Sequence, residues 1–128
     1  MRTIKFRAIC AFSGVWRYGF YYVSKGNHII RDENDKESIV LEKTLGQFTG
    51  LHDKNGKEIY EGDIVDVWSA GSHLPNGIIK FGQGAAKFFI GNESNSICWN
   101  LSGGGHNYTQ ENLEIIGNIF DDPELVKL

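Results

Sequence analysis

The feature that most limits the fold of this chain is a hairpin signal at Asn55-Gly56, between two short runs of strand-forming residues. A two-residue type I′ turn needs a positive φ at both central positions, and Asn-Gly adopts it readily. We therefore predict paired strands near residues 47–53 and 57–60. A second tight turn is predicted at residues 61–63, because Gly62 stands between two acidic residues there, and a buried strand should follow over 64–68.

Short strands separated by turn signals continue along the whole chain. Residues 3–9 alternate apolar and polar side chains, and residues 15–23 form the densest aromatic run. Such alternation is typical of half-buried strands. Gly19 interrupts the aromatic run, which indicates a bulge or a close approach of another backbone segment. Further strands are predicted over residues 28–31, 78–81, 86–90, 96–101 and 113–120.

Two segments fit less regular structure. Residues 39–45 are compatible with one turn of helix or with an extended strand, and we favour the extended form. Residues 69–77 are rich in Gly, Ser and Pro and end in a second Asn-Gly pair. We therefore predict a loop there that closes on a tight turn.

The composition agrees with a β-rich chain. The 128 residues include 16 glycines, and Phe, Tyr and Trp together also number 16. Aromatic residues favour strands, and glycines favour the tight turns between them. We predict a mostly β fold of short antiparallel strands, in which an N-terminal β-meander (residues 1–61) packs with an SH3-like small barrel (residues 62–128). A chain of this length buries enough surface to be stable as one compact unit.

The charge of the chain limits its partners. The net charge is −3, whereas a nucleic-acid-binding domain usually carries a basic patch or stripe. The one basic cluster, at Arg2, Lys5 and Arg7, alternates with apolar residues, and we interpret it as the solvated face of a strand. The first residues are charged, and no apolar stretch is long enough to span a membrane. We expect a cytoplasmic protein that binds no membrane and for which nucleic acid is a disfavoured partner.

No arrangement of residues indicates catalysis. Glu61 and Asp63 could pair as an acid and a base, but Gly62 predicts a turn in which a carboxylate accepts backbone amides. None of the four histidines stands at a metal-binding spacing from another histidine or a cysteine. We therefore expect no metal, no cofactor and no enzymatic activity.

The aromatic run has two apolar faces. Alternate residues of a strand share a face, so one face carries Trp16, Tyr18, Phe20 and Tyr22. Tyr21 and Val23 lie on the opposite face. One face must build the core, and the other then either joins the core or packs against another subunit. A further alternative is that exposed rings stack on single-stranded bases.

Several motifs, in this order, make the chain similar to the YopX-like family of phage and prophage proteins. They are residues 4–8, Trp16-Arg17-Tyr18-Gly19, the stretch 46–65, Ile116-Gly117-Asn118-Ile119-Phe120, and residues 122–125. The resemblance implies a β-rich fold with an SH3-like barrel, a phage or prophage origin and self-association, and it implies no catalytic residues. The chain departs from the family at Ile9-Cys10, where members often have Trp-Asp.

These observations predict a non-enzymatic binding or assembly protein that forms a homo-oligomer, with a phage or host protein as a further possible partner. The alternative is a nucleic-acid-binding small-barrel module in phage replication or regulation. The candidate binding residues come from the 47–65 stretch and from the aromatic strand. They are Thr49, Asp53, Tyr60, Glu61, Asp63, Trp16 and Tyr18.

Overall fold

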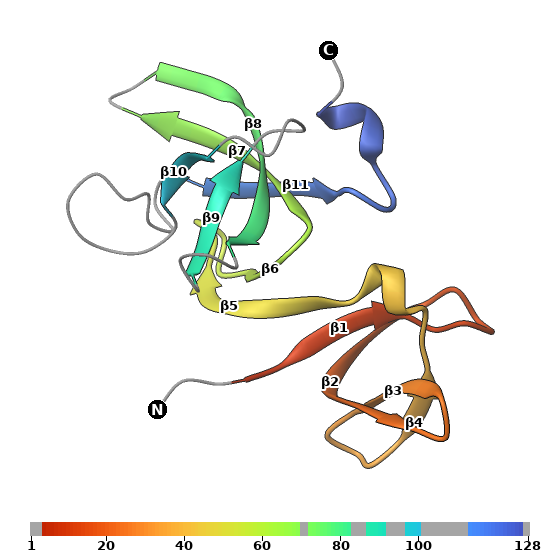
Figure 1. The fold of residues 1–128 in the computed structure, drawn as a ribbon. Coiled ribbons are helices and arrows are strands. Elements are labelled where there is room, and N and C mark those ends of the chain that lie inside the picture. Colours follow the sequence, from red (N-terminus) through yellow and green to blue (C-terminus); the bar gives the residue numbers. More distant parts are fainter. Residues whose placement is uncertain (1–3, 70–71, 83–86, 92–96, 101–112, 127–128) are drawn as a thin grey trace. The chain divides into compact units, whose positions relative to one another are not determined.

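The computed structural model describes residues 4–69, 72–82, 87–91, 97–100 and 113–126. Within these ranges the chain forms short antiparallel strands and single turns of 3-10 helix, without any α-helix (Figure 1). The prediction of a mostly β fold is confirmed. The chain divides into two compact units, residues 1–50 and 51–128. The predicted division after residue 61 lies within the second of them.

The first unit is a small antiparallel sheet with one helical turn. Its elements are β1 (Phe6–Ile9), β2 (Trp16–Ser24), β3 (Asn27–Arg31), β4 (Glu37–Ile39), η1 (Glu42–Thr44) and the first part of β5 (Gly46–His52). The order of hydrogen-bonded strands is β4-β3-β2-β1-β5-β6, and β5 crosses the division between the units. Strand β2 pairs with β1 through its first half and with β3 through its second half.

The second unit contains a five-stranded antiparallel sheet. Its elements are β6 (Glu58–Tyr60), β7 (Asp63–Ser69), β8 (Ser72–Gly82), β9 (Lys87–Gly91), β10 (Ile97–Asn100), β11 (Leu113–Asn118) and the 3-10 turn η3 (Pro123–Leu125). The strand order is β10-β9-β8-β7-β11. Among the described residues no pairing between β10 and β11 closes this sheet into a barrel. The SH3-like barrel therefore stays a prediction.

Each unit has its own apolar core. In the first unit the core contains Ala8, Ile30 and Val40, with Phe6 and Tyr21 packed against it. The core of the second unit is larger and draws on strands β6 to β9 and β11. Its buried members are Ile59, Val65, Val67, Ile79, Phe88, Ile90 and Leu113. The alternate positions of Val65 and Val67 follow from the two-residue period of a strand.

The type I′ turn lies at a different place from the predicted one. Lys25 and Gly26 both have positive φ, 52° and 80°, and they join Ser24 and Asn27 in the β2–β3 hairpin. At Asn55-Gly56 only the glycine has a positive φ, 80°. The chain does turn there, but the type I′ prediction was wrong, because an aspartate side chain organises a longer loop, as described below.

The loop predicted over residues 69–77 was also wrong, because β8 begins at Ser72. Its register against β7 shifts between Val65 and Val67, so that Pro75 falls in a bulge. A bulge is one of the few places in a sheet that tolerate proline, which donates no ladder hydrogen bond. At Gly77 a Cβ atom would lie 2.2 Å from Cγ2 of Ile90. This glycine serves close packing within the sheet.

The segment 39–45 is extended except for one helical turn. Ile39, Leu41 and Leu45 are extended, whereas Glu42–Thr44 forms the 3-10 turn η1, so the favoured extended form was wrong for these three residues. The Thr44 hydroxyl supplies the physical reason. It donates to the Leu41 carbonyl at 2.7 Å and accepts the Ile9 amide at 2.9 Å, which ties the turn to β1.

Gly19 is the point at which β2 passes from one partner strand to the other. Its φ is +152°, and a Cβ atom built on it would lie 2.1 Å from the Arg31 carbonyl oxygen. The predicted close backbone approach is confirmed. No side chain fits there unless the backbone of β2 or β3 moves.

We expect Gly19→Ala to lower the free energy of unfolding by at least about 3 kcal/mol, because the new methyl group meets backbone rather than a movable side chain. Gly26→Ala is the matched control, since its φ is +80° but nothing lies within 4 Å of the added Cβ. It should cost only about 1 kcal/mol, the strain of the left-handed conformation. Urea unfolding measures both, and equal losses would contradict the steric explanation.

Candidate functional site

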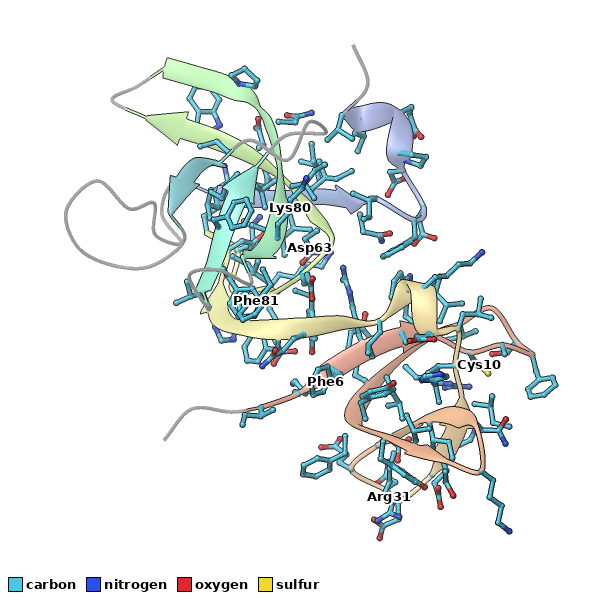
Figure 2. The ribbon with its side chains drawn as sticks, viewed as in Figure 1. Phe6, Cys10, Arg31, Asp63, Lys80 and Phe81 are labelled. Carbon is cyan, nitrogen blue, oxygen red and sulfur yellow. The ribbon has the colours of Figure 1, made fainter. Side chains whose placement is uncertain are left out.

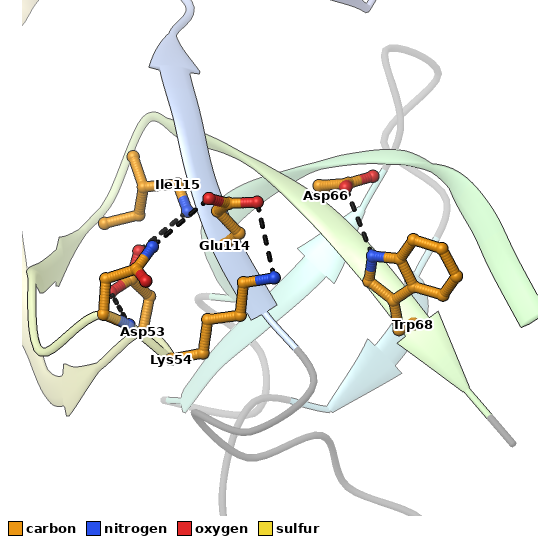
Figure 3. A network of polar contacts seen from close by, with 7 residues as sticks. Asp53, Lys54, Asp66, Trp68, Glu114 and Ile115 are labelled. Carbon is orange, nitrogen blue, oxygen red and sulfur yellow. Dashed lines mark hydrogen bonds and ion pairs between the residues drawn. The ribbon is translucent and has the colours of Figure 1, made fainter. Parts of the chain in front are cut away.

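The Asp53 carboxylate organises the loop between β5 and β6. Asp53 is only 2% exposed, and its Oδ1 accepts the backbone N–H groups of Asn55 and Lys57, each at 2.9 Å. Its Oδ2 accepts the N–H of Ile115 on β11, also at 2.9 Å (Figure 3). One side chain therefore shapes the turn and fixes it to a strand about 60 residues later in the chain.

The charge state of Asp53 depends on these contacts. Burial raises the pKa of the carboxyl, but the amides of Ile115, Lys57 and Asn55 and the charge of Lys57 outweigh it, so the pKa lies below its ordinary value. A lowered pKa means that folding favours the ionised form. This stabilisation is complete above the pKa of the unfolded chain and is lost as the pH falls through the lower pKa of the folded protein.

Further contacts hold the same loop against β11. The Lys54 amide donates to the Leu113 carbonyl at 2.9 Å. The Glu114 carboxylate contacts the Lys54 ammonium at 3.5 Å and accepts the Asn55 side-chain amide at 3.2 Å (Figure 3). These charged groups are partly exposed, and such pairs contribute little free energy. The buried Asp53 bonds dominate the attachment.

Asp63 plays a similar part in the next turn. It is buried, and its Oδ2 accepts the Tyr60 amide at 2.7 Å, as the predicted turn at residues 61–63 requires. Tyr60 is buried as well, and its hydroxyl donates to Glu58 at 3.0 Å. Thr49 is buried within β5, and Glu61 is half-buried in the turn. The predicted site residues of this stretch are thus mainly inside the fold, and their role in binding stays a prediction.

The loop built by Asp53 occurs a second time, at residues 32–36. Asp32 Oδ1 accepts the amides of Asn34 and Lys36, each at 2.9 Å, and the Asp32 amide donates to the Lys36 carbonyl at 3.0 Å. Both loops read Asp-x-Asn-x-Lys, with a positive φ before the lysine, at Asp35 (63°) and Gly56 (80°). Asp32 is less buried, and among the described residues it makes no third bond to a distant strand. This shared spacing was the sequence signal that our prediction missed.

The aromatic strand β2 divides its side chains between the core and the solvent. Tyr21 packs against Phe6, with ring centroids 5.7 Å apart, and joins the core of the first unit. On the other face Tyr18 is 45% exposed and Phe20 is 71% exposed. The face of β2 that carries Tyr21 therefore builds the core, and the rings of Tyr18 and Phe20 lie on the surface of the opposite face.

Cations accompany the aromatic rings of the first unit. The Arg7 guanidinium lies 4.7 Å from the Trp16 ring centroid, and the Arg31 guanidinium lies 5.5 Å from that of Tyr22. Such contacts are favourable because the ring face is electron-rich. Arg7 is buried, whereas Arg31 is exposed, so on the surface it is Arg31 that accompanies the aromatic rings of β2 (Figure 2).

Two adjoining hollows lie on this surface, of about 350 and 370 Å³, and both are lined by Lys5, Gly19, Asp32 and Glu33. The first is also lined by Trp16, Arg17, Tyr18 and Asn34. The second is also lined by Ile4, Phe20, Arg31 and Asp35. Three basic and three acidic side chains line them together, so their formal charges offset. We call this surface the β2 hollow.

A chain of polar contacts runs through the first unit. The Tyr21 hydroxyl lies 2.5 Å from Nδ1 of His28, and Nε2 of His28 lies 3.2 Å from the Glu42 carboxylate. Burial, together with the charge of Glu42, raises the pKa of the Tyr21 hydroxyl. A raised pKa makes tyrosinate less accessible, which opposes a role as nucleophile. These three residues were not predicted as a group, because they belong to three different elements, β2, β3 and η1.

Cys10 is a buried free thiol in the turn after β1. A hydrogen bond with the Ser13 side chain is the main cause that lowers the pKa of the Cys10 thiol to about 7, and the backbone of Ser13 and Phe12 contributes in the same direction.

The described residues hold no group of three or more His, Cys, Asp and Glu side chains that could bind a metal ion. His106, one of the four histidines, lies outside them. In the same part of the chain no helix has the length and apolar character that a membrane span needs.

Comparison with known proteins identifies relatives without a named activity. A family model described as "YopX protein" matches residues 5–127. A solved structure, titled "Crystal structure of protein EF1440 from Enterococcus faecalis", is 21% identical in sequence. The match covers 99% of this chain and 100% of that one, with a TM-score of 0.54. This similarity concerns the fold alone. The chain matches no curated protein.

The two Asp-x-Asn-x-Lys loops allow a matched test of how much the burial of the aspartate adds to the free energy of unfolding. Asp53→Ala leaves three backbone amides without their acceptor inside the second unit, and we expect it to lower the free energy of unfolding by about 3 kcal/mol. Asp32→Ala disrupts the same local turn in an exposed loop and should cost about 1 kcal/mol.

Acid unfolding of the same variants tests the sign of the pKa effect. Wild type should lose stability more steeply than Asp53→Ala as the pH falls below about 4, because only wild type has this carboxylate to protonate. Urea unfolding across that pH range measures the difference. Parallel pH profiles for the two proteins would show that Asp53 is not ionised preferentially in the fold.

Proposed function

The chain belongs to the YopX protein family, whose model spans residues 5–127, and from this premise we propose that it is a non-enzymatic binding and assembly protein that self-associates. The observation that carries the proposal is the outer face of β2. Tyr18 and Phe20 lie there as neighbouring exposed rings, beside the β2 hollow. The core of the first unit is built from the opposite face of the same strand.

Exposed aromatic rings of this kind favour a protein partner. Each buried square ångström of apolar surface contributes roughly 25 cal/mol, and an aromatic ring brings more such surface than any other side chain. Aromatic residues are accordingly enriched at the centres of protein interfaces, with polar groups at the rim. The rings of Tyr18 and Phe20, with charged side chains around them, have this arrangement.

The charges of the β2 hollow argue against a polyphosphate partner. Nucleic-acid binding gains most of its affinity from basic groups that neutralise phosphates. Here the basic Lys5, Arg17 and Arg31 are offset by an equal number of acidic side chains on the same lining. This balance favours the assembly role over the alternative, a nucleic-acid-binding module.

The polar groups inside the fold support a non-enzymatic role. The carboxylates of Asp53 and Asp63 accept backbone amides, which fixes both side chains in structural positions. Burial and the charge of Glu42 raise the pKa of the Tyr21 hydroxyl, which disfavours its ionised, nucleophilic form. Asp63, one member of the candidate acid–base pair, is therefore engaged in holding a turn.

We also propose that the five-stranded sheet of the second unit forms an SH3-like small barrel. Register shifts interrupt the β9–β10, β7–β11 and β7–β8 ladders, and such irregularities bend strands and increase their twist. A phage or prophage origin and a cytoplasmic location belong to the same proposal. They rest on the family resemblance.

The self-association proposal predicts that one ring controls the oligomeric state. Phe20→Ser removes the most exposed aromatic ring of β2, so this variant should remain monomeric at protein concentrations at which wild type associates. Phe12→Ser is the matched control, because Phe12 is 84% exposed but lies in the β1–β2 turn. Sedimentation velocity over a range of concentrations measures all three proteins.

Wild type that sediments as a monomer at every concentration would overturn self-association. Equal association of the Phe20→Ser and Phe12→Ser variants and wild type would show that the outer face of β2 is not the interface. Circular dichroism of each variant checks that the fold is retained.

A further inference from the structure

The loop at residues 32–36 repeats the hydrogen bonds of the loop at residues 53–57. In each loop the aspartate Oδ1 accepts the amides of the residues two and four positions later, all at 2.9 Å. The aspartate amide donates to the carbonyl of the lysine, at 3.0 Å in the first loop and 2.8 Å in the second. The aspartate carbonyl accepts the amide three positions later, at 3.0 Å in both. The two loops therefore have the same internal hydrogen-bonding geometry.

The Asp53 loop uses two further groups to hold the edge of a strand. Asp53 Oδ2 accepts the Ile115 amide at 2.9 Å (Figure 3). The Lys54 amide donates to the Leu113 carbonyl, also at 2.9 Å. A carbonyl and an amide two residues apart lie on the same edge of an extended strand. Between them, the Glu114 carboxylate contacts the Lys54 ammonium at 3.5 Å. The loop thus binds three consecutive residues of an extended chain.

The Asp32 loop has the same two groups at a surface. Among the described residues, neither Asp32 Oδ2 nor the Glu33 amide takes part in a hydrogen bond. Asp32 and Glu33 line both parts of the β2 hollow. The exposed rings of Tyr18 and Phe20 line the same hollow. The groups with which the Asp53 loop binds β11 therefore recur beside a hollow that has room for a further segment.

We propose that the Asp32 loop binds an extended segment of a partner protein through the two backbone hydrogen bonds by which the Asp53 loop holds β11. One carbonyl of the segment accepts the Glu33 amide, and the amide two residues later donates to Asp32 Oδ2. Main-chain bonds of this kind give affinity for an added strand, while neighbouring side chains give specificity. This inference goes beyond the self-association proposed above and does not depend on it.

Charge complementarity identifies the middle residue of the segment. In the Asp53 loop the middle residue is the acidic Glu114, and the loop residue opposite it is the basic Lys54. The corresponding loop residue beside Asp32 is Glu33, which is exposed and takes part in no ion pair within the described part of the chain. The sign is therefore reversed, and we expect lysine or arginine in the middle. Apolar residues should flank it, as Leu113 and Ile115 flank Glu114.

A nuclear magnetic resonance titration tests this binding. The probes are two blocked peptides, Thr-Val-Arg-Val-Thr and Thr-Val-Glu-Val-Thr, added to the full chain labelled with nitrogen-15. The arginine peptide should shift the Glu33 amide resonance in a saturable manner, because that amide gains a carbonyl acceptor. The glutamate peptide should bind at least about tenfold more weakly, because it places like charges opposite each other.

Asp32→Asn tests the acceptor without removing the loop. Asparagine keeps one side-chain oxygen for the amides of Asn34 and Lys36, but its second group is a donor. We expect the arginine peptide to bind at least about tenfold more weakly, since a bond to a charged acceptor is lost. Asp35→Asn is the matched control, because it removes the same charge and asparagine tolerates the φ of 63° there. It should change the affinity by no more than about twofold, because it removes a charge but none of the proposed bonds.

Glu33→Lys tests the choice of the middle residue. This variant gives the Asp32 loop the charge that Lys54 provides in the other loop. The glutamate peptide should then bind more tightly than the arginine peptide, which inverts the wild-type preference. The amide spectrum of each variant without peptide confirms that the fold is retained.

The outcomes decide the proposal. A saturable shift at Glu33, lost in Asp32→Asn and inverted in its charge preference by Glu33→Lys, supports it. A Glu33 resonance that stays unchanged at millimolar arginine peptide overturns it, and so does equal binding by wild type and Asp32→Asn. A Glu33 resonance that moves with the concentration of the protein itself, but not with either peptide, identifies a second copy as the occupant and also overturns it.

Discussion

The buried Asp53 carboxylate is the contact on which the second unit depends. Three backbone amides converge on it, two from its own loop and one from Ile115 on β11. It thereby sets the path of the chain between β5 and β6 and holds that path against the edge of the five-stranded sheet. Ile59, which follows the loop directly, is then placed in the core with Leu113. The stretch 47–65, the most distinctive part of the sequence, therefore has a structural role.

The first unit shows how one strand can serve two purposes. Gly19 lets β2 exchange one partner strand for the other, because only a residue without a side chain fits beside the Arg31 carbonyl. Gly19 also lines the β2 hollow. Tyr21 then stabilises the core while Phe20 is left at the surface. Fold and proposed interface thus share one residue, which ties the function of the strand to its geometry.

Local patterns predicted most of the strands, since apolar alternation and turn residues act over a few positions. Residues 15–23 and 113–120 are examples, as is the close approach at Gly19. The errors arose where a distant or unusual contact decides the conformation. At Asn55-Gly56 the loop is held by hydrogen bonds to the Asp53 side chain, so no type I′ turn forms there. In β8 a bulge accommodates Pro75 within the strand. The Tyr21–His28–Glu42 contacts and the β2 hollow could not be predicted from the sequence. Their residues have no characteristic spacing along the chain and come together only in the folded protein.

Self-association through the outer face of β2 is the proposal on which the function of this protein depends. Hydrogen–deuterium exchange of the wild-type protein at low and high concentration tests it most directly. We expect amides in residues 16–20 and in the loop 32–36 to become more protected as the concentration rises, while the turn that contains Phe12 exchanges at a constant rate. Exchange in residues 16–20 that does not depend on concentration, or protection confined to another part of the chain, would contradict it.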